Sequence, residues 1–365
     1  MVDEAALRAA IGKVEDPEIH RSLEELNMLR AVDVADDGSV AVLVALTIPG
    51  CPLKDKLTED VTAAAKTVQG VTAVAVSFTS MTDEERASLV SDIRGGEERD
   101  IAVARPGSKT RIIAVSSGKG GVGKSSVTTN LAVALADLGK TVGVIDADVW
   151  GFSIPRMLGV DRPPTVVEET LFPPEAHGVK TMSMDFFVGD DQAVIWRGPM
   201  LHKALEQFLA DVHWGDPDYL LIDMPPGTGD ISISISQFLP TAQALIVTTP
   251  QITAQRVAKR AGLMALKVNQ TILGVVENMS WFTGDDGKQY SIFGEGGGEA
   301  LAEELEVPLL GRVPLVPALR SGADVGEPVS IADPGGEAAR AFAAIAAEVE
   351  KLKPRLRSHP QLVIS

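Results

Sequence analysis

The sequence predicts an α/β protein in which a small α/β domain precedes a doubly wound, mostly parallel sheet. Two observations favour this fold class. From residue 111 onward, short apolar runs typical of buried strands alternate with helical stretches, as in parallel strands joined by crossover helices. The first of these strands also leads through a glycine-rich loop directly into a helix, as phosphate-binding loops do.

The first 80 residues are expected to form the small domain. Residues 4–14 have a helical pattern, and Asp16-Pro17-Glu18-Ile19 is expected to turn into a second short helix. Asp36-Asp37-Gly38 separates two strand-like runs and predicts a hairpin. The two hairpin strands, the next helix and the last strand are expected at 30–34, 39–46, 53–68 and 71–78.

A linker is expected at residues 81–110, which are charged and interrupted by Gly and Pro, with room for one short helix at the start. Residues 111–365 are expected to form the larger domain. Its strands are predicted at 112–115, 141–145, 219–222, 244–248, 272–276 and 308–313, and its helices at 126–138, 200–212, 252–267 and 297–305. Such sheets bind ligands at the carboxyl ends of their strands, so the functional site is expected there.

Residues 118–125, Gly-Lys-Gly-Gly-Val-Gly-Lys-Ser, match the pattern G-x-x-x-x-G-K-[ST] of a phosphate-binding loop. Backbone N–H groups must turn inward around phosphate oxygens, and a Cβ at the glycines would clash or forbid the required φ. Lys124 is expected to contact the β and γ phosphates of ATP, and the Ser125 hydroxyl to bind Mg²⁺. The sequence therefore predicts a P-loop NTPase fold. Its nucleotide contacts are expected from Gly118, Lys119, Gly120, Gly121, Val122, Gly123, Lys124, Ser125 and Ser126.

Carboxylates end two of the predicted strands. Asp146-Ala147-Asp148 follows the second strand, and Asp223 ends an apolar run in the usual form of a Walker B site. Beside a phosphate loop, such carboxylates hold Mg²⁺ or orient an attacking water. We therefore expect Asp148 and Asp223 to manage Mg²⁺, and Asp148 to act in ATP hydrolysis with the two loop lysines. The turn 225–230, Pro-Pro-Gly-Thr-Gly-Asp, is expected to be a switch loop.

Lys119 is a second lysine, placed directly after the first glycine of the loop. This arrangement resembles the deviant Walker A class of ATPases. The resemblance implies a homodimer in which Lys119 reaches across to the partner's nucleotide, with ATP held between the subunits and hydrolysis linked to dimer opening.

Further motifs narrow the resemblance. Residues 146–155, 192–200, 225–230, 277–280 and 292–298 together are similar to the Mrp/ApbC family of iron–sulfur cluster carrier ATPases. The first domain resembles the small iron–sulfur assembly domain fused in front of bacterial members, through 16–19 and 47–52. The resemblance implies delivery of clusters to apoprotein clients, contacts with iron–sulfur assembly proteins, and adenine contacts from Asn278, Arg312 and Pro314.

The sequence departs from this family at one place. Cluster-carrying members have a Cys-x-x-Cys pair between the second-last and last of these motifs, so that two subunits supply four thiolates to a [4Fe–4S] cluster. Residues 281–291 contain no cysteine, and Asp286-Gly287 predicts a hairpin turn instead. Carboxylates are poor substitutes for thiolates around such clusters. The protein either binds a cluster with outside ligands or assists cluster assembly without carrying one.

Cys51 is the single cysteine, which excludes an internal disulfide. It lies between two prolines on a loop that leads into a predicted helix, and a helix N-terminus favours the thiolate form. Cys51 is therefore a candidate iron–sulfur or thiol site, in which case the first domain would be a thiol-bearing adaptor regulated by the ATPase. The alternative is a small buried residue without chemistry.

The composition limits the partners. The net charge of −17 argues against general affinity for nucleic acid or anionic membrane, and no apolar run is long enough to span a bilayer. We therefore expect a cytoplasmic protein that binds neither nucleic acid nor membrane. A competing hypothesis is a nucleotide-switched dimer similar to MinD and ParA, which would locate itself on membrane or DNA.

Overall fold

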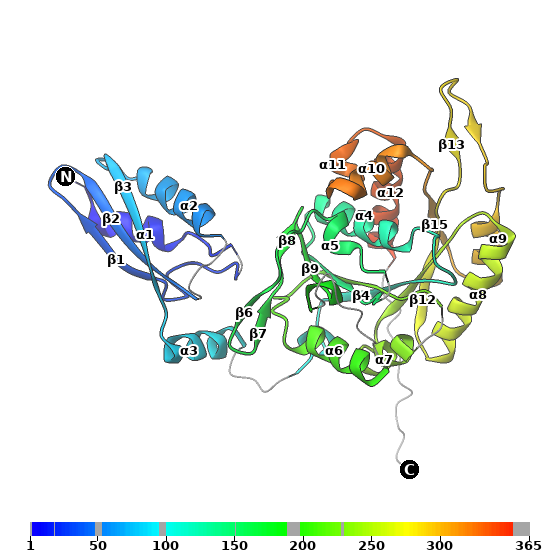
Figure 1. Ribbon diagram of the computed structural model, residues 1–365, viewed down its shortest axis with the longest axis horizontal. Helices are drawn as coiled ribbons and strands as arrows, with labels where there is room; N and C mark the ends of the chain where they lie inside the picture. The colour runs from blue at the N-terminus through cyan, green and yellow to red at the C-terminus, as the bar shows by residue number, and fades with distance from the viewer. Residues whose placement is uncertain are drawn as a thin grey trace, which may run out of the picture. The chain divides into compact units, whose positions relative to one another are not determined.

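The computed structural model describes most of the chain (Figure 1), namely residues 2–17, 19–47, 53–94, 100–149, 151–187, 198–227 and 230–352. These residues form two compact units. Unit 1 consists of Met1–Asp100, Pro164–Pro173 and Asp211–His213, and unit 2 consists of Ile101–Pro163, Pro174–Ala210 and Trp214–Ser365. None of the described helices combines the length and the hydrophobicity that a membrane-spanning helix requires.

Unit 1 is built on a three-stranded sheet. The strands β1 and β2 form the antiparallel hairpin that the sequence predicts, and β3 adds to β2 in parallel. One helix precedes the hairpin, a second follows it, and a third follows the last strand of the sheet. The elements are α1 (Glu4–Gly12), β1 (Leu29–Val34), β2 (Ser39–Leu46), α2 (Lys54–Lys66), β3 (Ala73–Ser80) and α3 (Asp83–Arg94).

The expectation of a second short helix after the Asp16-Pro17 turn is wrong. The chain makes turns over the described residues 19–28. Asp16 Oδ1 accepts the N–H of Ile19 at 2.9 Å, and Glu15 pairs with Ser22 in an isolated β-bridge. His20 has a φ of +56°, which lies outside the helical region. The local side-chain bond therefore competes successfully with helix formation.

Helix α3 occupies the start of the segment expected to be a linker and belongs to unit 1. Thr82 and Glu85 form a capping box at its N-terminus. The Glu85 N–H donates to Thr82 Oγ1 at 3.2 Å, and the Thr82 N–H donates to Glu85 Oε2 at 2.9 Å. This reciprocal cap satisfies two N–H groups at the helix start, so the helix begins firmly despite its charged sequence.

Unit 1 also includes a hairpin from much later in the chain, β6 (Thr165–Val167) and β7 (Thr170–Phe172), which the sequence pattern does not predict. Val167 and Phe172 are each 1 % exposed and belong to the hydrophobic core of unit 1. Arg86 of α3 lies 3.4 Å from Glu168 in the turn of this hairpin. The core of unit 1 thus needs residues that are distant in sequence.

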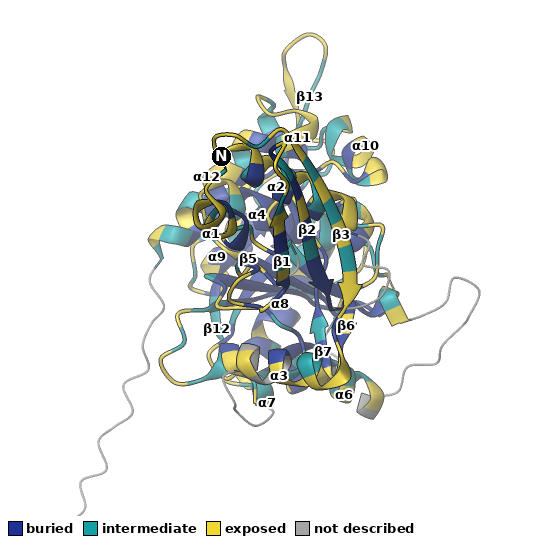
Figure 2. Ribbon diagram, turned by 90° about the vertical axis from the view of Figure 1, so that its left-hand side faces the viewer, coloured by how far each residue is buried: buried dark blue, intermediate teal, exposed yellow. Residues whose placement is uncertain are grey.

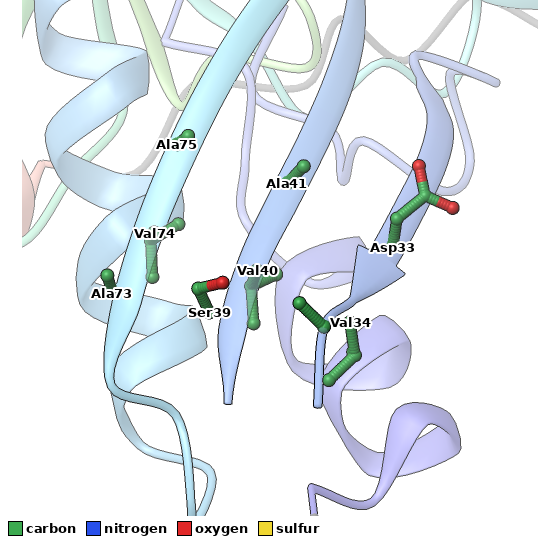
Figure 3. Close-up of a pocket in the computed structure, with 9 residues that line it drawn as sticks. Asp33, Val34, Ser39, Val40, Ala41, Ala73, Val74 and Ala75 are labelled. Carbon is green, nitrogen blue, oxygen red and sulfur yellow. The ribbon is translucent and has the colours of Figure 1, made fainter. Parts of the chain in front are cut away.

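One face of the unit 1 sheet stays open. Figure 2 shows the edge strand β3 as largely intermediate or exposed and β1 and β2 as partly buried. The register places Asp33, Ala41 and Ala75 side by side, and all three are exposed, so they mark the open face. A shallow pocket of about 350 Å³ lies on the sheet near the hairpin turn (Figure 3). Its lining contains a single titratable side chain, Asp33, so the pocket offers no acid–base pair. The lining residues are Asp33, Val34, Ala35, Ser39, Val40, Ala41, Ala73, Val74 and Ala75.

Unit 2 contains an eight-stranded sheet in the order β15-β12-β11-β4-β10-β5-β9-β8. All neighbours are parallel except β8 and β9, which confirms the doubly wound, mostly parallel sheet. Each of the six predicted strands is present, and β8 and β9 are additional. The strands are β4 (Arg111–Ser117), β5 (Val142–Asp146), β8 (Glu175–Ala176), β9 (Val179–Ser183), β10 (Tyr219–Asp223), β11 (Gln243–Thr248), β12 (Thr271–Glu277) and β15 (Leu309–Arg312).

Helices cover both faces of this sheet. The connections β4-α4-β5 and β11-α8-β12 run in opposite directions across it, so right-handed crossovers place α4 and α8 on opposite faces. Helix α12 packs beside α4 (Figure 1). The main helices are α4 (Lys124–Asp137), α6 (Gly198–Ala210), α7 (Asp230–Phe238), α8 (Ile252–Lys267), α9 (Gly297–Glu304), α10 (Pro317–Val325) and α12 (Glu337–Lys351), with shorter turns η1 (Ala102–Ala104), α5 (Ile154–Met157), η2 (Met184–Phe187) and α11 (Val329–Ala332).

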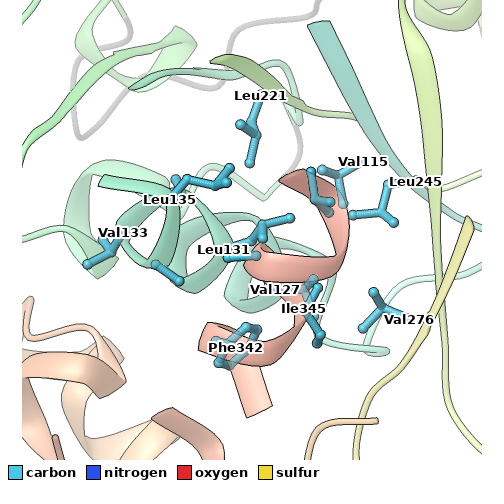
Figure 4. Packing of buried hydrophobic residues seen from close by; sticks show 14 of the residues in the cluster. Val115, Val127, Leu131, Val133, Leu135, Leu221, Leu245, Val276, Phe342 and Ile345 are labelled. Carbon is cyan, nitrogen blue, oxygen red and sulfur yellow. The ribbon is translucent and has the colours of Figure 1, made fainter. Parts of the chain in front are cut away.

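The larger part of the core of unit 2 lies between the sheet and the helices α4 and α12 (Figure 4), and a smaller cluster lies between the sheet and the helices α8 and α9. Side chains of α4 and α12 meet side chains of β4, β10, β11 and β12, and all of those labelled are nearly inaccessible to solvent. Each fully buried aliphatic or aromatic side chain contributes roughly 1.5–3 kcal/mol. The packing therefore holds α4, and the loop that precedes it, rigidly against β4. The labelled residues are Val115, Val127, Leu131, Val133, Leu135, Leu221, Leu245, Val276, Phe342 and Ile345.

A partly buried polar cluster joins α12 to the amino-terminal edge of the sheet. Arg111 Nη1 donates to Tyr219 Oη at 2.8 Å and to the Val349 carbonyl at 2.7 Å. The Tyr219 hydroxyl donates to Glu350, which also pairs with Lys140 at 2.5 Å. Burial raises the pKa of Tyr219. The hydrogen bonds that Glu350 accepts from Lys140 and Tyr219 lower the pKa of Glu350. The cluster thus adds polar contacts to the apolar packing that holds α12.

Removing this hydroxyl by Tyr219→Phe is expected to lower the free energy of unfolding by about 1–2 kcal/mol, because Arg111 and Glu350 lose a buried partner. Urea unfolding followed by tryptophan fluorescence measures this change. The matched control is Tyr290→Phe, since the Tyr290 hydroxyl donates to Asp286 on an exposed hairpin and its loss should cost less than about 0.5 kcal/mol. Equal effects of the two substitutions would contradict the assignment.

Candidate functional site

The candidate site lies where β4, β10 and β5 end side by side. The register pairs Asp223 with Val115 on one side and with Asp146 on the other. Parallel pairing therefore brings the loop after β4 and the two strand-end carboxylates to one edge of the sheet. These are residues that the sequence analysis identified from separate motifs.

The loop between β4 and α4 depends on three of its glycines. Gly121 and Gly123 have φ values of +79° and +80°, a conformation that L side chains rarely adopt. A Cβ on Gly118 would lie 2.2 Å from the backbone carbon of Val257 in α8, and a Cβ on Gly123 would lie 2.2 Å from Asn278 Nδ2. The loop is thus shaped by its own backbone and by close neighbours on two sides.

Gly120 does not meet the expectation that a side chain is forbidden at every loop glycine. Its φ lies outside the positive range, and a Cβ there would meet no atom within 4 Å. The loop points this residue outward, where nothing in the chain crowds it. Gly120 therefore differs from the other three loop glycines.

The Asp223 carboxylate contacts three polar side chains from the end of the loop motif and the start of α4. Lys124 Nζ lies 2.5 Å from Oδ2, the Ser125 hydroxyl donates to the same oxygen at 2.6 Å, and Thr128 Oγ1 donates to Oδ1 at 2.6 Å. Asp223 is 0 % exposed and Lys124 only 6 %. The pair is buried, and removing one partner of such a pair typically costs about 3–5 kcal/mol. Asp148 Oδ2 lies 3.5 Å from the same ammonium group.

Asp146 sits beside this cluster but has a different role from Asp148. Its Oδ2 accepts the N–H groups of Ser153 and Ile154 at 3.0 and 3.2 Å, and its Oδ1 accepts the N–H of Asp148 at 3.2 Å. Burial, and then the negative charge of Asp223, raises the pKa of Asp146 to about 7. Asp146 therefore organises the loop that carries Asp148.

Lys119 lies on the rim of the loop and is half-buried. Its Nζ lies 3.4 Å from Oε1 of Gln251, the residue before α8. The Ser117 hydroxyl donates to the Lys119 carbonyl at 3.1 Å, which holds the backbone at the strand end. The side chain is thus directed toward α8 and away from Asp223.

Asn278 holds the loop from the other side. Its Nδ2 donates to the carbonyl of Val122 at 3.0 Å, and the residue is 4 % exposed. The Ser126 carbonyl, one turn into α4, accepts from Asn130 Nδ2 at 2.8 Å. These two side-chain amides therefore hold backbone carbonyls on either side of Lys124.

The two other residues assigned to adenine contacts are Arg312, the last residue of β15, and Pro314, two residues further along the chain. Arg312 is largely committed to acidic partners, with its Nη2 2.8 Å from Glu299 and its Nε 3.5 Å from Glu277. Pro314 is buried. The structure therefore brings Asn278 to the phosphate loop and pairs Arg312 with α9 and β12.

Three further residues at the site were not recognised from sequence. Thr128 follows Lys124 by one helical turn, a spacing that could have suggested its contact with Asp223. Gln251 carries no sequence signal. Glu277 is 2 % exposed and accepts from Gly298 N at 2.6 Å and Ser280 Oγ at 2.9 Å, so it ties the start of α9 to β12. Its place at a strand end was the available hint.

Residues 281–291, which contain no cysteine, form a hairpin, as predicted. The strands β13 (Phe282–Thr283) and β14 (Gln289–Tyr290) pair antiparallel, and Gly287 has a φ of +74° in the turn (Figure 1). Asp286 Oδ1 accepts the N–H of Lys288 at 3.1 Å. Cys51, and residues 228 and 229 of the expected switch loop, lie outside the described residues. Within the described ranges, no group of three or more His, Cys, Asp or Glu could hold a metal ion.

Residues 108–350 match the family model described as "NUBPL iron-transfer P-loop NTPase". This match covers well over half of the chain. The chain belongs to the NUBPL iron-transfer P-loop NTPase family. Residues 4–78 match a second model, described as "Iron-sulfur cluster assembly protein". Both matches confirm the resemblance to Mrp/ApbC proteins with a fused assembly-type domain.

Known proteins with similar sequences and structures support this family membership. The chain is 53 % identical over 337 residues to the "Iron-sulfur cluster carrier protein" of Mycobacterium bovis, covering 90 % of this chain and 88 % of that protein. It is similar to a nucleotide-binding protein of Archaeoglobus fulgidus solved with ADP, with a TM-score of 0.56 and 35 % identity over 72 % of this chain and 97 % of that one. The cell division ATPase MinD of Pyrococcus furiosus has a TM-score of 0.53 and 30 % identity, covering 67 % of this chain and 99 % of that one.

The loop glycines of this NUBPL-family NTPase give a first test. Gly123→Ala is expected to lower the free energy of unfolding by more than about 1 kcal/mol, because alanine at positive φ is strained and its Cβ would meet Asn278. Gly120→Ala should change it by less than about 0.5 kcal/mol. Thermal unfolding without nucleotide measures both. Equal unfolding midpoints for the two variants would contradict the role given to Gly123.

The pKa of Asp146 gives a second test. Folding holds the Asp146 proton up to about pH 7, whereas the unfolded chain releases it near 3.8, so this group makes stability fall as pH rises between those values. Asp146→Asn should therefore gain stability relative to the wild type from pH 4 to pH 7. Thermal unfolding midpoints across this range measure the difference.

Asp218 is the control of opposite sign. The N–H of Thr141 lowers the pKa of Asp218, so Asp218→Asn should lose stability relative to the wild type as pH rises from acid values. Parallel midpoint curves for the wild type and Asp146→Asn would show that Asp146 is not held protonated.

Proposed function

We propose that the protein is a cytoplasmic, homodimeric, Mg²⁺-dependent ATPase that carries or assembles iron–sulfur clusters for apoprotein clients. The observation that carries the ATPase part is the meeting of Lys124 and Ser125 at Asp223, directly below a glycine loop that opens into α4. The family match supports the same conclusion. Neither nucleic acid nor membrane is among the proposed partners.

The residues present fit MgATP. Loop N–H groups and the start of α4 favour phosphate oxygens, and Lys124 supplies a positive charge for the β and γ phosphates. Ser125, Asp148 and Asp223 offer hard oxygen atoms, which Mg²⁺ prefers. Bound Mg²⁺ would neutralise charge on the phosphates. Lys124 must exchange part of its contact with Asp223 for the phosphates, so nucleotide binding and the buried ion pair are linked.

Lys119 has a proposed role across the dimer. It lies on the loop rim and bonds only weakly, at 3.4 Å, to Gln251. A rim lysine held by one long hydrogen bond can leave it at small cost to meet a phosphate of the partner's nucleotide. Stabilising charge on the transferred phosphoryl group is the contribution expected from it.

The proposed cargo of this ATPase is an iron–sulfur cluster. The mycobacterial relative is named a carrier protein, and residues 4–78 match an assembly-type domain. The hairpin 282–290 has no thiol, so Cys51 is the sole cysteine ligand that each subunit can supply to a [4Fe–4S] cluster. The proposal is therefore a shared site with one Cys51 thiolate from each subunit and the remaining ligands from outside, such as small thiols or the client.

Two observations favour other functions. The absence of cysteine from 281–291 favours an assembly factor that uses ATP without holding a cluster. The similarity to MinD supports a nucleotide-switched dimer in general.

The test measures ATP hydrolysis and bound cluster in the same preparations. Wild type, Cys51→Ala and Lys119→Ala are reconstituted anaerobically with iron and sulfide, and iron and sulfide are counted per dimer. Cys51→Ala should lose the cluster and keep hydrolysis, while Lys119→Ala should keep the cluster and lose hydrolysis by at least about tenfold. Transfer to an apo-acceptor protein is then measured for the loaded wild type.

The outcomes separate the candidates. A stoichiometric cluster that needs Cys51 and moves to the acceptor supports a carrier. Intact ATP hydrolysis without any bound cluster identifies an assembly factor or switch instead. Loss of nucleotide binding in Lys119→Ala would remove its role across the dimer, since that role leaves the subunit's own phosphate contacts in place.

A further inference from the structure

Helix α8 is strongly basic in an acidic protein. Its 16 residues include Arg256, Lys259, Arg260 and Lys267 and no acidic residue, whereas the whole chain has a net charge of −17. Positive charge is therefore concentrated on one surface element next to the phosphate loop.

The cations and two leucines share the outward side of this helix. Arg256, Arg260, Leu263 and Lys267 follow one another at i, i+4, i+7 and i+11, and all four are exposed. Leu263 is 50 % exposed and the neighbouring Leu266 48 %. At 1.5 Å per residue, the stripe from Arg256 to Lys267 is roughly 17 Å long. We call these five residues the α8 stripe: Arg256, Arg260, Leu263, Leu266 and Lys267.

The cations of the α8 stripe have no acidic partner among the described residues. Lys259, which lies outside the stripe, pairs with Glu304 of α9 at 2.9 Å. No ion pair between described residues involves Arg256, Arg260 or Lys267. Three positive charges and two half-exposed leucines thus remain available on one side of a rigid helix.

The apolar side of α8 is already used within unit 2. Ala254, Ala258, Ala261 and Ala265 are between 1 and 6 % exposed and face the sheet. A helix that binds a membrane surface must insert its apolar side, and α8 cannot do so without leaving the sheet. The negative net charge also opposes approach to nucleic acid. An acidic protein segment fits better, because it needs only a narrow row of charges and a few apolar contacts.

The α8 stripe is mechanically joined to the phosphate loop. Gly118 packs so closely on α8 that a Cβ would lie 2.2 Å from the Val257 backbone, and Gln251 at the start of the helix contacts Lys119 at 3.4 Å. A change in the loop on binding nucleotide therefore acts directly on the N-terminal half of α8.

We propose that the α8 stripe is a docking surface for an acidic, amphipathic helical segment of a partner protein, and that nucleotide in the adjacent loop changes its affinity. Asp or Glu side chains of the partner would face Arg256, Arg260 and Lys267, and apolar side chains would cover Leu263 and Leu266. The docking itself does not depend on the proposed function. The effect of nucleotide on the docking rests on the proposed ATPase function.

The test uses a fluorescein-labelled helical peptide with Glu and Leu at i, i+4 spacing, and a scrambled peptide of the same composition. Fluorescence anisotropy with the full chain at about 0.1 M salt measures affinity. The charge-reversed variant Arg256→Glu/Arg260→Glu should bind at least about tenfold more weakly, and Leu263→Ser about threefold. The control, Arg320→Glu/Arg340→Glu, changes two exposed arginines on α10 and α12 and should bind like the wild type.

Several results would overturn the docking proposal. They are no saturable binding, equal binding of the scrambled peptide, unchanged affinity in the α8 variants, or equal loss in the control. Stripe-dependent pelleting with phosphatidylglycerol vesicles or retardation of duplex DNA would assign the surface to another class of partner, and stripe-dependent self-association in sedimentation would assign it to a second copy. Circular dichroism melting identifies unfolded variants, and Leu263→Ser keeps the test decisive if charge reversal unfolds the chain.

The nucleotide effect is measured separately. Peptide affinity should differ by at least about threefold between ADP and a non-hydrolysable ATP analogue. A fluorescent ADP first shows that nucleotide binds. Equal peptide affinities with nucleotide bound overturn the coupling alone, whereas failure of nucleotide to bind contradicts the proposed ATPase and leaves the docking result standing.

Discussion

A buried carboxylate at the end of a central strand controls the arrangement of this protein. Asp223 has no access to water, so its charge must be met by groups that the fold brings to it. Lys124, Ser125 and Thr128 meet it from the loop and first turn of α4. The position of α4, and of the phosphate loop that precedes it, therefore depends on this charge as well as on apolar packing.

The loop is also held from both flanks. Helix α8 touches Gly118, and Asn278 bonds to the Val122 carbonyl and crowds Gly123. Events at the loop can thus be transmitted in two directions, along α8 to its basic surface and through residues 277–280 to the hairpin and α9. Glu277 supports the second route, because its carboxylate joins β12 to the start of α9. A P-loop ATPase that serves other proteins needs such connections between nucleotide and partner surfaces.

The missing thiols set the chemical limit on cluster binding. Where related carriers are expected to place a cysteine pair, this chain has a regular hairpin whose turn is fixed by Asp286 and Gly287. Iron–sulfur clusters require soft ligands, and a chain with one cysteine cannot enclose a cluster unaided. The nucleotide machinery and the family membership remain, so any cluster must be shared with other molecules.

The sequence alone determined the fold class, the family and the identity of the loop residues, because a phosphate loop needs particular residue types at fixed spacing and parallel strands have a clear pattern. It also contained the Thr82 and Glu85 capping box of α3, which the charged composition concealed. Only the tertiary structure placed β6 and β7 in unit 1, since that depends on contacts between distant segments. Likewise, the register of β5 and β10 decided that Asp146 and Asp223 are neighbours and so have different roles. Long-range pairing, which no local pattern encodes, separates the carboxylate that organises a loop from the one that faces the lysine.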